Sequence, residues 1–206
     1  MPTKILKMKL KGQGALAYRI SHRAYWYLKN GEWYVSPTPP EGAYFYKSNL
    51  YLGRYTTSIF ITPKLQKLAG ITQGAWLEPA GGSKYRLKKP ERAPAPAFIT
   101  SVRRGAPPSY VTTVPAPILE YFGLKAHQRA YIELEPPFMY FKPTPPKECV
   151  APFCGKRALR ATGPHNIIIT IPAGIVKLLE IKPRDKLVWR LVTENSVEVR
   201  KGEPPP

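Results

Sequence analysis

The stretch from Ile167 to Arg200 constrains the fold of this chain more than any other. Residues 167–171 are a run of branched, almost entirely apolar side chains, which is typical of a buried strand. Pro172 ends that strand because proline has no backbone N–H to donate. Apolar residues then recur every three or four positions, which predicts a helix of about two turns with one buried face. These apolar residues are Ile175, Leu178, Leu179 and Ile181.

A hairpin completes this stretch. Residues 182–185 (Lys-Pro-Arg-Asp) have the composition of a turn, and Pro183 closes the helix. Alternating apolar residues lie on both sides of residues 193–196, which predicts two antiparallel strands. They are Leu187, Trp189 and Leu191 before the turn, and Val197 and Val199 after it. The unit is therefore a strand, a short helix and a hairpin.

This order of elements resembles the SpoVT-AbrB (swapped-hairpin AbrB) family, over about a sixth of the chain. The resemblance is carried by Ile171-Pro172, by residues 178–181 and by residues 182–185, with Glu180 and Arg184 at the family's usual glycine positions. It implies that two copies interleave their hairpins into one β-barrel. It also implies a DNA-contacting surface of arginines on the first strand, on its turn and at the start of the helix.

The rest of the chain repeats the same order of elements. Residues 112–140 form a second copy and residues 59–87 a third, and residues 17–46 form an eroded copy whose turn after the helix shrinks to Asn30-Gly31. An additional strand precedes each copy, at residues 4–11, 50–52, 98–102 and 156–160. We therefore expect a mainly β fold with short helices, arranged as tandem swapped-hairpin AbrB-like β-barrels.

Four copies suffice for two barrels within one chain, which would be a monomeric pseudo-dimer. We expect barrels at residues 1–91 and 97–203, with the alanine- and proline-rich residues 90–97 as the linker. The alternative is a break at residues 143–152, which would leave the last copy to pair with another molecule as a homodimer. Prolines gather between the expected elements, as stiffened connections that suit a thermostable protein.

The charge of the chain predicts a polyanionic partner. There are 32 Lys and Arg against 13 Asp and Glu, giving a formal net charge of +19 spread along the whole sequence. Nucleic acid is favoured over a membrane because the expected helices are too short to form a basic amphipathic anchor. General solubility is the alternative explanation of the charge.

Basic residues lie at or near the tip of every expected hairpin, where they can reach phosphates without being buried. Lys64 adds a charge at a helix start, where Ala116 and Ala173 stand in two other copies and give no support for base contact. The candidate nucleic-acid-binding residues are Lys9, Lys11, Arg19, Arg54, Lys64, Arg103, Arg104, Lys156, Arg157 and Arg160.

The aromatic residues of the N-terminal copy have two interpretations. Most are expected in a barrel core, because alternation places about half of the side chains of a strand inside. Residues 25–27 (Tyr-Trp-Tyr) cannot all point inward, so we expect some exposed aromatic surface there, suited to RNA bases or to a protein partner.

Enzymatic chemistry finds no support in the sequence. His22, His127 and His165 lie apart, and no nucleophile motif, phosphate-binding glycine loop or paired carboxylate is present, so we expect no catalytic residue, no metal and no cofactor. Cys149 and Cys154 lack the partners of a zinc site. They are compatible with a disulfide, which is rare in the cytosol outside hyperthermophiles, or with two free thiols.

These features favour a cytoplasmic, nucleoid- or ribosome-associated protein that binds nucleic acid. The first interpretation is a DNA-binding transcriptional regulator or a chromatin-type protein. A binder of structured RNA is the first alternative, and an antitoxin-like interaction module is the second. No apolar run is long enough to span a bilayer, and residues 1–14 lack the apolar region of a signal peptide.

Overall fold

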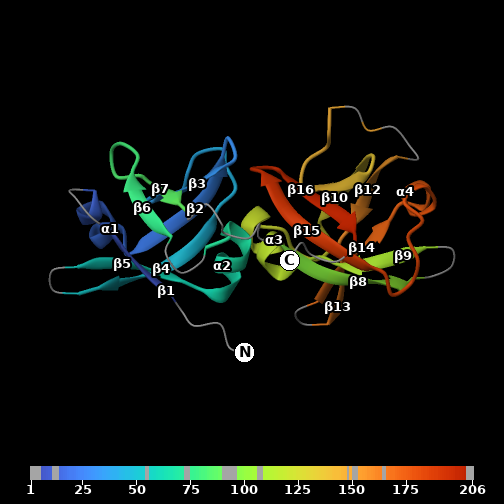
Figure 1. Cartoon of the computed structure of the whole chain (residues 1–206), viewed down its shortest axis with the longest axis horizontal. Coiled ribbons are helices and arrows are strands. Elements are labelled where there is room, and N and C mark those ends of the chain that lie inside the picture. Colours follow the sequence, from blue (N-terminus) through green and yellow to red (C-terminus); the bar gives the residue numbers. More distant parts are fainter. Residues whose placement is uncertain are drawn as a thin grey trace. The chain divides into compact units, whose positions relative to one another are not determined.

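The computed structural model describes residues 6–10, 14–53, 56–71, 75–89, 97–105, 109–147, 149, 153–163 and 166–202. It is mainly β, with 51% of residues in strands, four short helices and two nearly closed barrel-like sheets (Figure 1). Residue contacts divide the chain into two compact units, Met1–Pro96 and Ala97–Pro206. The expected mainly β fold with short helices is thus confirmed. Most of the expected linker, residues 90–96, lies outside the described residues.

The first unit is a sheet of seven strands with two helices. Along the chain its elements are β1 (Leu6–Leu10), α1 (Ala15–Ser21), β2 (Arg23–Lys29), β3 (Glu32–Ser36), β4 (Tyr46–Leu52), β5 (Thr57–Ile61), α2 (Pro63–Ala69), β6 (Trp76–Pro79) and β7 (Tyr85–Lys88). The strands lie in the order β1-β5-β4-β2-β3-β7-β6, and each strand is antiparallel to its neighbours. The end strands β1 and β6 also contact each other, which nearly closes the sheet.

The third copy, residues 59–87, is confirmed as a strand, a helix and a hairpin. Thr62 caps α2 because its side chain accepts a hydrogen bond from the backbone N–H of Leu65 at 3.3 Å, and Pro63 occupies the first turn. Gly70 ends the helix at φ 62°, a conformation that glycine adopts without steric cost.

The eroded copy differs from its prediction. Residues 17–21, expected as a strand, belong to α1, and residues 25–28, expected in the helix, belong to β2. Asn30 and Gly31 are the turn of the β2–β3 hairpin, both at positive φ, and not a turn after a helix. Tyr18 anchors α1 because its hydroxyl donates to the carbonyl oxygen of Val35 at 2.7 Å, and burial raises the pKa of its phenol.

The second unit is a sheet of nine strands with two helices. Its elements are β8 (Phe98–Arg104), β9 (Tyr110–Thr113), α3 (Ala116–Phe122), β10 (Arg129–Glu135), β11 (Phe138–Lys142), β12 (Cys154–Ala158), β13 (Arg160–Gly163), β14 (Asn166–Ile171), α4 (Ala173–Leu178), β15 (Lys186–Thr193) and β16 (Ser196–Lys201). The strand order is β12-β10-β11-β16-β15-β8-β9-β14-β13. Contacts between β12 and β14 nearly close this sheet.

The second unit consists of two halves related by a pseudo-twofold pattern of strand pairing. We call residues 97–142 the first half and residues 153–202 the second half. β8 of the first half pairs with β15, and its counterpart β12 pairs with β10. β9 pairs with β14, and β11 with β16. Each half therefore pairs its first strand with the strand that follows the helix of the other half.

The turn after each helix has the same geometry in both halves. Asp185 accepts a hydrogen bond from the backbone N–H of Lys182 at 2.7 Å, and Gln128 accepts one from that of Lys125 at 2.6 Å. Arg184 and His127 occupy equivalent positive-φ positions, at 75° and 69°. The turn expected at residues 182–185 is confirmed. The helix before it is shorter than expected: α4 ends at Leu178, whose side chain is 54% exposed.

The aromatic residues of the first unit mainly fill its interior. Trp26, Tyr27, Trp33 and Tyr46 are buried, and Tyr25, Tyr34, Tyr44 and Phe45 are half-buried. Residues 25–27 contribute no fully exposed aromatic side chain to the aromatic surface expected near the N-terminus. The Tyr27 ring stacks on Tyr34 and the Tyr25 ring packs edge-on against Phe45, and these contacts cover them. The exposed aromatics among the described residues are Tyr51, Trp76 and Phe153.

Candidate nucleic-acid interface

The predicted binding residues that the structure describes are distributed over both units. Lys11 and Arg54 lie outside the described residues. In the first unit, Lys9 is exposed on β1, Arg19 is half-buried in the last turn of α1, and Lys64 is exposed in the first turn of α2. In the second unit, Arg103 and Arg104 are exposed at the end of β8, close to the tip of the β8–β9 hairpin.

Three of the predicted residues come together in the second half of the second unit. Lys156 and Arg157 lie on β12, and Arg160 begins β13. The sequence predicts Arg157 and Arg160 at or near a hairpin tip. Arg160 pairs with Ile168 on β14 shortly before the strands end at Gly163 and Asn166, whereas Arg157 lies further back, on β12. Lys156 and Arg157 pair with Tyr131 and Ala130 on β10, within the wall of the barrel.

These three cations border a surface pocket with a volume of about 430 Å³. The residues that line it are Ser109, Lys156, Arg157, Ala158, Arg160, Thr170, Ile171 and Ala173. They come from the tip of the β8–β9 hairpin, from β12 and β13, from the end of β14 and from the start of α4. Among the described residues that line the pocket, none is acidic. We call this the β12 pocket.

Arg157 is the most enclosed of the three cations. Its Nη1 donates to the carbonyl oxygen of Lys156 at 3.2 Å, while its Nε is buried without a hydrogen-bond partner in the described structure. A side chain on Gly155 would interfere with it: a Cβ there would lie 3.0 Å from both Cζ and Nη2 of Arg157. The absence of a side chain at Gly155 is what leaves room for the guanidinium.

Five of the described acidic residues pair with cations outside the β12 pocket. Glu32 and Glu78 bind Arg86 in the first unit, and side-chain hydrogen bonds from Tyr34 and Arg86 lower the pKa of Glu32. In the second unit, Lys142 pairs with Glu133 and Glu135, and Lys201 pairs with Asp185 at 3.0 Å. None of the ion pairs between described residues involves Arg103, Arg104 or the three cations of the β12 pocket.

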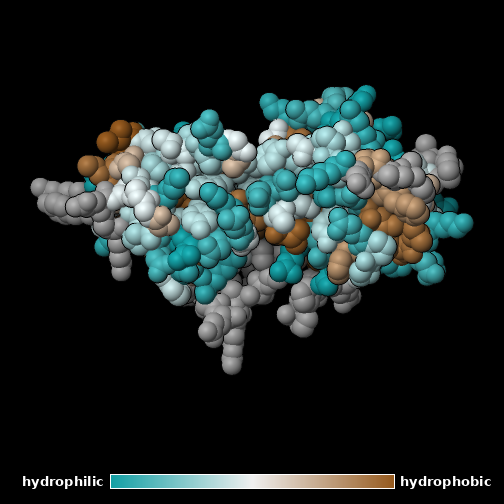
Figure 2. Space-filling model, turned by 90° about the horizontal axis from the view of Figure 1, so that it is seen from above, coloured by the Kyte–Doolittle hydropathy of each residue, from teal (hydrophilic) through white to brown (hydrophobic). Residues whose placement is uncertain are grey.

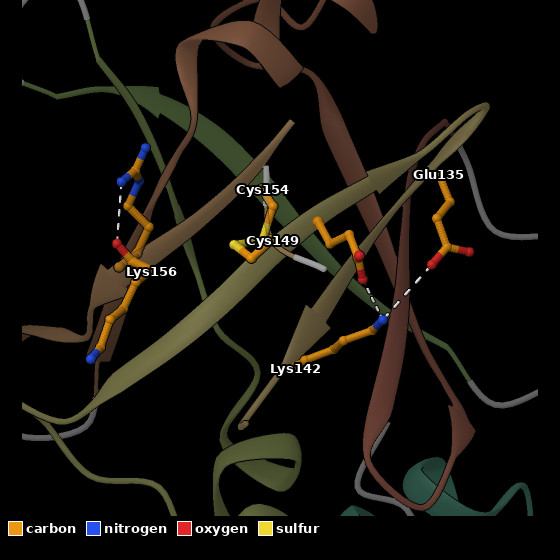
Figure 3. Close-up of a disulfide and its surroundings, with 7 residues drawn as sticks. Glu135, Lys142, Cys149, Cys154 and Lys156 are labelled. Atoms are coloured by element: carbon orange, nitrogen blue, oxygen red, sulfur yellow. Dashed lines mark hydrogen bonds and ion pairs between the residues drawn. A yellow bond between two sulfur atoms is a disulfide. The ribbon is translucent and has the colours of Figure 1, made fainter. Parts of the chain in front are cut away.

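A disulfide holds the start of β12. Cys149 and Cys154 are joined, and Cys154 is the first residue of the strand that carries Lys156 (Figure 3). The close-up also shows Lys142 turned toward Glu135, with which it forms an ion pair. The disulfide, one of the two outcomes left open by the sequence, therefore ties the preceding loop to the strand that forms one wall of the β12 pocket.

Ser109, Thr170 and Gly155 belong to the candidate site but were missed from the sequence. A comparison of the two halves does single out Gly155 and Arg157. Val102 and Leu159 exchange equivalent backbone hydrogen bonds with the turn after the helix, so the two halves can be aligned with Val102 on Leu159. Phe98 then falls on Gly155, and Thr100 falls on Arg157. An aromatic residue and a hydroxyl in one repeat are thus replaced by glycine and arginine in the other.

No other class of site is indicated. Among the described residues, no group of three or more His, Cys, Asp or Glu side chains is placed to hold a metal ion. None of the helices that the structure describes has the length and apolar character needed to cross a membrane. Comparison with protein-family models, with curated proteins and with solved structures found no match to this chain.

Proposed function

We propose that this chain is a nucleic-acid-binding protein without enzymatic activity, and that duplex DNA is its preferred partner, as for a transcriptional regulator or chromatin-type protein. The observation that carries the proposal is a concentration of unpaired cations. Arg103, Arg104, Lys156 and Arg160 are exposed, and none is in an ion pair with a described residue. The excess of positive charge, +19 overall, is thus available to a polyanion.

We also propose that both units are AbrB-like. The resemblance of residues 171–185 to that family is supported by the way in which each half of the second unit gives its first strand to the other half. The first unit would be a degenerate version, in which α1 is the next described element after β1.

In this proposal, the exposed cations bind phosphates along the nucleic-acid backbone. The face drawn in Figure 2 is mostly hydrophilic, with apolar atoms confined to a few patches, which agrees with a largely electrostatic contact. Each neutralised phosphate releases counterions, so affinity falls with salt in proportion to the number of contacts. Arginine side chains at the end of β8 are the candidates for reaching base edges, since guanidinium matches guanine in the major groove.

The test is fluorescence anisotropy with a labelled DNA duplex over a salt series. The binding variant replaces three cations of the β12 pocket by alanine, and the control variant replaces three exposed lysines of the first unit. They are Lys156→Ala, Arg157→Ala and Arg160→Ala, and Lys29→Ala, Lys67→Ala and Lys84→Ala. Both triple variants lose the same charge, so a difference between them reports on location.

We expect the binding variant to lose about tenfold or more in affinity at 0.1 M salt and to show a shallower salt dependence, because up to about three phosphate contacts are removed. The control variant should lose much less. Equal losses in the two variants would mean that net charge alone drives binding, and would contradict the proposed site. Absence of DNA binding by the unmodified protein would contradict the proposed function.

Structured RNA is the second candidate, favoured by one observation in the first unit. Tyr51 is 46% exposed, and the Nζ of Lys7 lies 4.4 Å from the centre of its ring. Trp76 is 53% exposed. Exposed rings beside a cation suit the stacking of unpaired bases. Preference for a stem-loop RNA over duplex DNA, lost in Tyr51→Ala with Trp76→Ala, would favour this candidate over the first.

A further inference from the structure

The β12 pocket contains an arginine that the fold itself does not require. Three equivalent strand positions can be compared. Two carry hydroxyl residues: Ser48 on β4 pairs with Ala24, and Thr100 on β8 pairs with Leu187. The third carries Arg157, which pairs with Ala130 on β10. The structure uses these hydroxyls in its core. Trp26 Nε1 donates to Ser48 at 2.9 Å, and Trp189 Nε1 donates to Thr100 at 2.7 Å.

The pairing of β12 with β10 lacks this tryptophan and hydroxyl pair. Ile132 stands at the position of the tryptophan, and Gly155 replaces the aromatic residue that is Tyr46 in the first unit and Phe98 in the first half. Arg157 fills the space over Gly155 with its guanidinium. The position that holds a hydrogen-bonded core hydroxyl on β4 and β8 therefore holds a cation on β12, and this cation lines a pocket. The Nε–H of Arg157 is buried and lacks an acceptor among the described residues.

The other side chains that line the pocket indicate which kind of ligand could accept hydrogen bonds from Arg157. Lys156 and Arg160 are exposed on the rim, and the hydroxyl residues Ser109 and Thr170 also line the pocket. Three cations without a lining carboxylate match a dianion, and a phosphate monoester carries a charge of about −1.5 to −2 at pH 7. Arg157 lines the pocket, so a group that contacts its guanidinium must enter the pocket. A terminal phosphate, attached through one oxygen, can enter further than a backbone phosphate flanked by two sugars.

We propose that the β12 pocket binds a phosphate monoester, either on a free nucleotide or at the 5′ end of a nucleic-acid strand, with Arg157 as its central ligand. The choice of a nucleotide phosphate rests on the proposed function. The volume of about 430 Å³ leaves room for the sugar behind the phosphate. Gly155 helps to position the guanidinium, because a Cβ there would lie 3.0 Å from Cζ and Nη2 of Arg157 and would require them to shift.

The first experiment observes the arginine Nε–H groups of the whole protein by ¹H–¹⁵N NMR during titration with dAMP. Arg157→Lys removes one resonance and so assigns Arg157, and Arg190→Lys assigns an exposed arginine on β15 as the internal control. We expect a saturable shift of the Arg157 Nε–H with dAMP, none with deoxyadenosine, and none at Arg190. Movement of both arginines together, or no movement at Arg157, would overturn the proposal for a free nucleotide.

The second experiment compares a single-stranded oligonucleotide with a 5′ phosphate and the same strand with a 5′ hydroxyl. If the source of the phosphate is a strand end, we expect about tenfold tighter binding of the phosphorylated strand, a difference of about one pair of charge-assisted bonds. Arg157→Thr should abolish the difference. This variant introduces the residue that the fold carries at the equivalent position, so we expect it to fold. Gly155→Ala should reduce the difference, and Arg190→Thr should not.

The two experiments separate this proposal from the proposed function. If both strands bind equally and dAMP leaves Arg157 unmoved, the pocket proposal is wrong while nucleic-acid binding stands. If dAMP moves Arg157 but neither strand binds, the pocket proposal holds for a free nucleotide and the proposed function fails.

Discussion

The two halves of the second unit share a fold but not a surface. Both follow the same pairing pattern and the same turn after the helix. At equivalent positions, however, the first half has Phe98 and Thr100, which serve the core, and the second has Gly155 and Arg157, which border a pocket. A repeat can thus keep its backbone while one copy gives up part of its core packing and acquires a charged site.

The largest expected difference between the halves is in nucleic-acid affinity. Lys156→Ala with Arg160→Ala should lower affinity for duplex DNA by about tenfold or more, because both cations border one pocket and can act on the same phosphates. Arg103→Ala with Arg104→Ala, which removes the same charge from the first half, should have a smaller effect. Electrophoretic mobility shifts at one fixed salt concentration compare the two, and a larger loss in the first half would reverse the assignment.

For the free energy of unfolding, the substitution in the first half should have the larger effect. Thr100→Ala removes the acceptor of the buried Trp189 Nε–H and a partner of the buried Thr112 hydroxyl, which should lower the free energy of unfolding by about 2 kcal/mol. Arg157→Thr should change it by less than about 1 kcal/mol, because it removes a buried Nε–H that has no acceptor. Urea unfolding measures both variants. Equal destabilisation would show that Arg157 is a structural residue.

Reduction of the disulfide should destabilise the second unit, because the bond between Cys149 and Cys154 holds the start of β12. Breaking the bond between Cys149 and Cys154 releases a short loop, and loop entropy alone gives a loss of up to about 2 kcal/mol. Thermal unfolding with and without a thiol reductant measures it. Cys149→Ala with Cys154→Ala is the control, which should be insensitive to the reductant. A response of that variant would place the effect elsewhere.

The smallest effect concerns the turns after the helices. Burial alone would raise the pKa of Asp185, but the backbone N–H of Lys182 and the ammonium of Lys201 outweigh it and lower that pKa below its ordinary value of 3.8. A carboxylate with a lowered folded-state pKa stabilises the fold above its unfolded pKa, and this stability is lost as pH falls through the folded value.

Asp185→Asn should therefore cost about 1 kcal/mol at pH 7, and the cost should vanish in acid below the folded-state pKa. Gln128→Ala in the first half should cost a similar amount that does not depend on pH, because Gln128 carries no charge. Chemical unfolding at pH 7 and at low pH measures both. A constant cost for Asp185→Asn would show that its charge contributes nothing.

Parts of the fold could be predicted where one physical rule dominates. The apolar run before Pro172 and the turn that ends in Asp185 are fixed by proline chemistry and by local hydrogen bonds, and both are confirmed. The helix α1 was missed because its apolar side chains do not mark a buried face: Leu16 is 64% and Ile20 75% exposed, and only Tyr18 is buried.

The candidate site was predicted in its residue types more than in its geometry. Charge alone selected Lys156, Arg157 and Arg160, but their convergence on one pocket depends on strands far apart in the sequence, β12 with β10 and β14 with β9. The side chain of Arg157 can fold over position 155 because that residue is glycine. Its orientation also depends on the partner strand β10. The geometry of the site therefore depends on tertiary contacts that a sequence pattern does not reveal.

The most direct test of nucleic-acid binding through the second half is hydrogen–deuterium exchange of the whole protein with and without duplex DNA. We predict the strongest protection in peptides covering residues 153–163, weaker protection at residues 101–105, and little change over residues 23–36 of the first unit. Protection confined to the first unit, or absent from residues 153–163 at saturating DNA, would contradict the account.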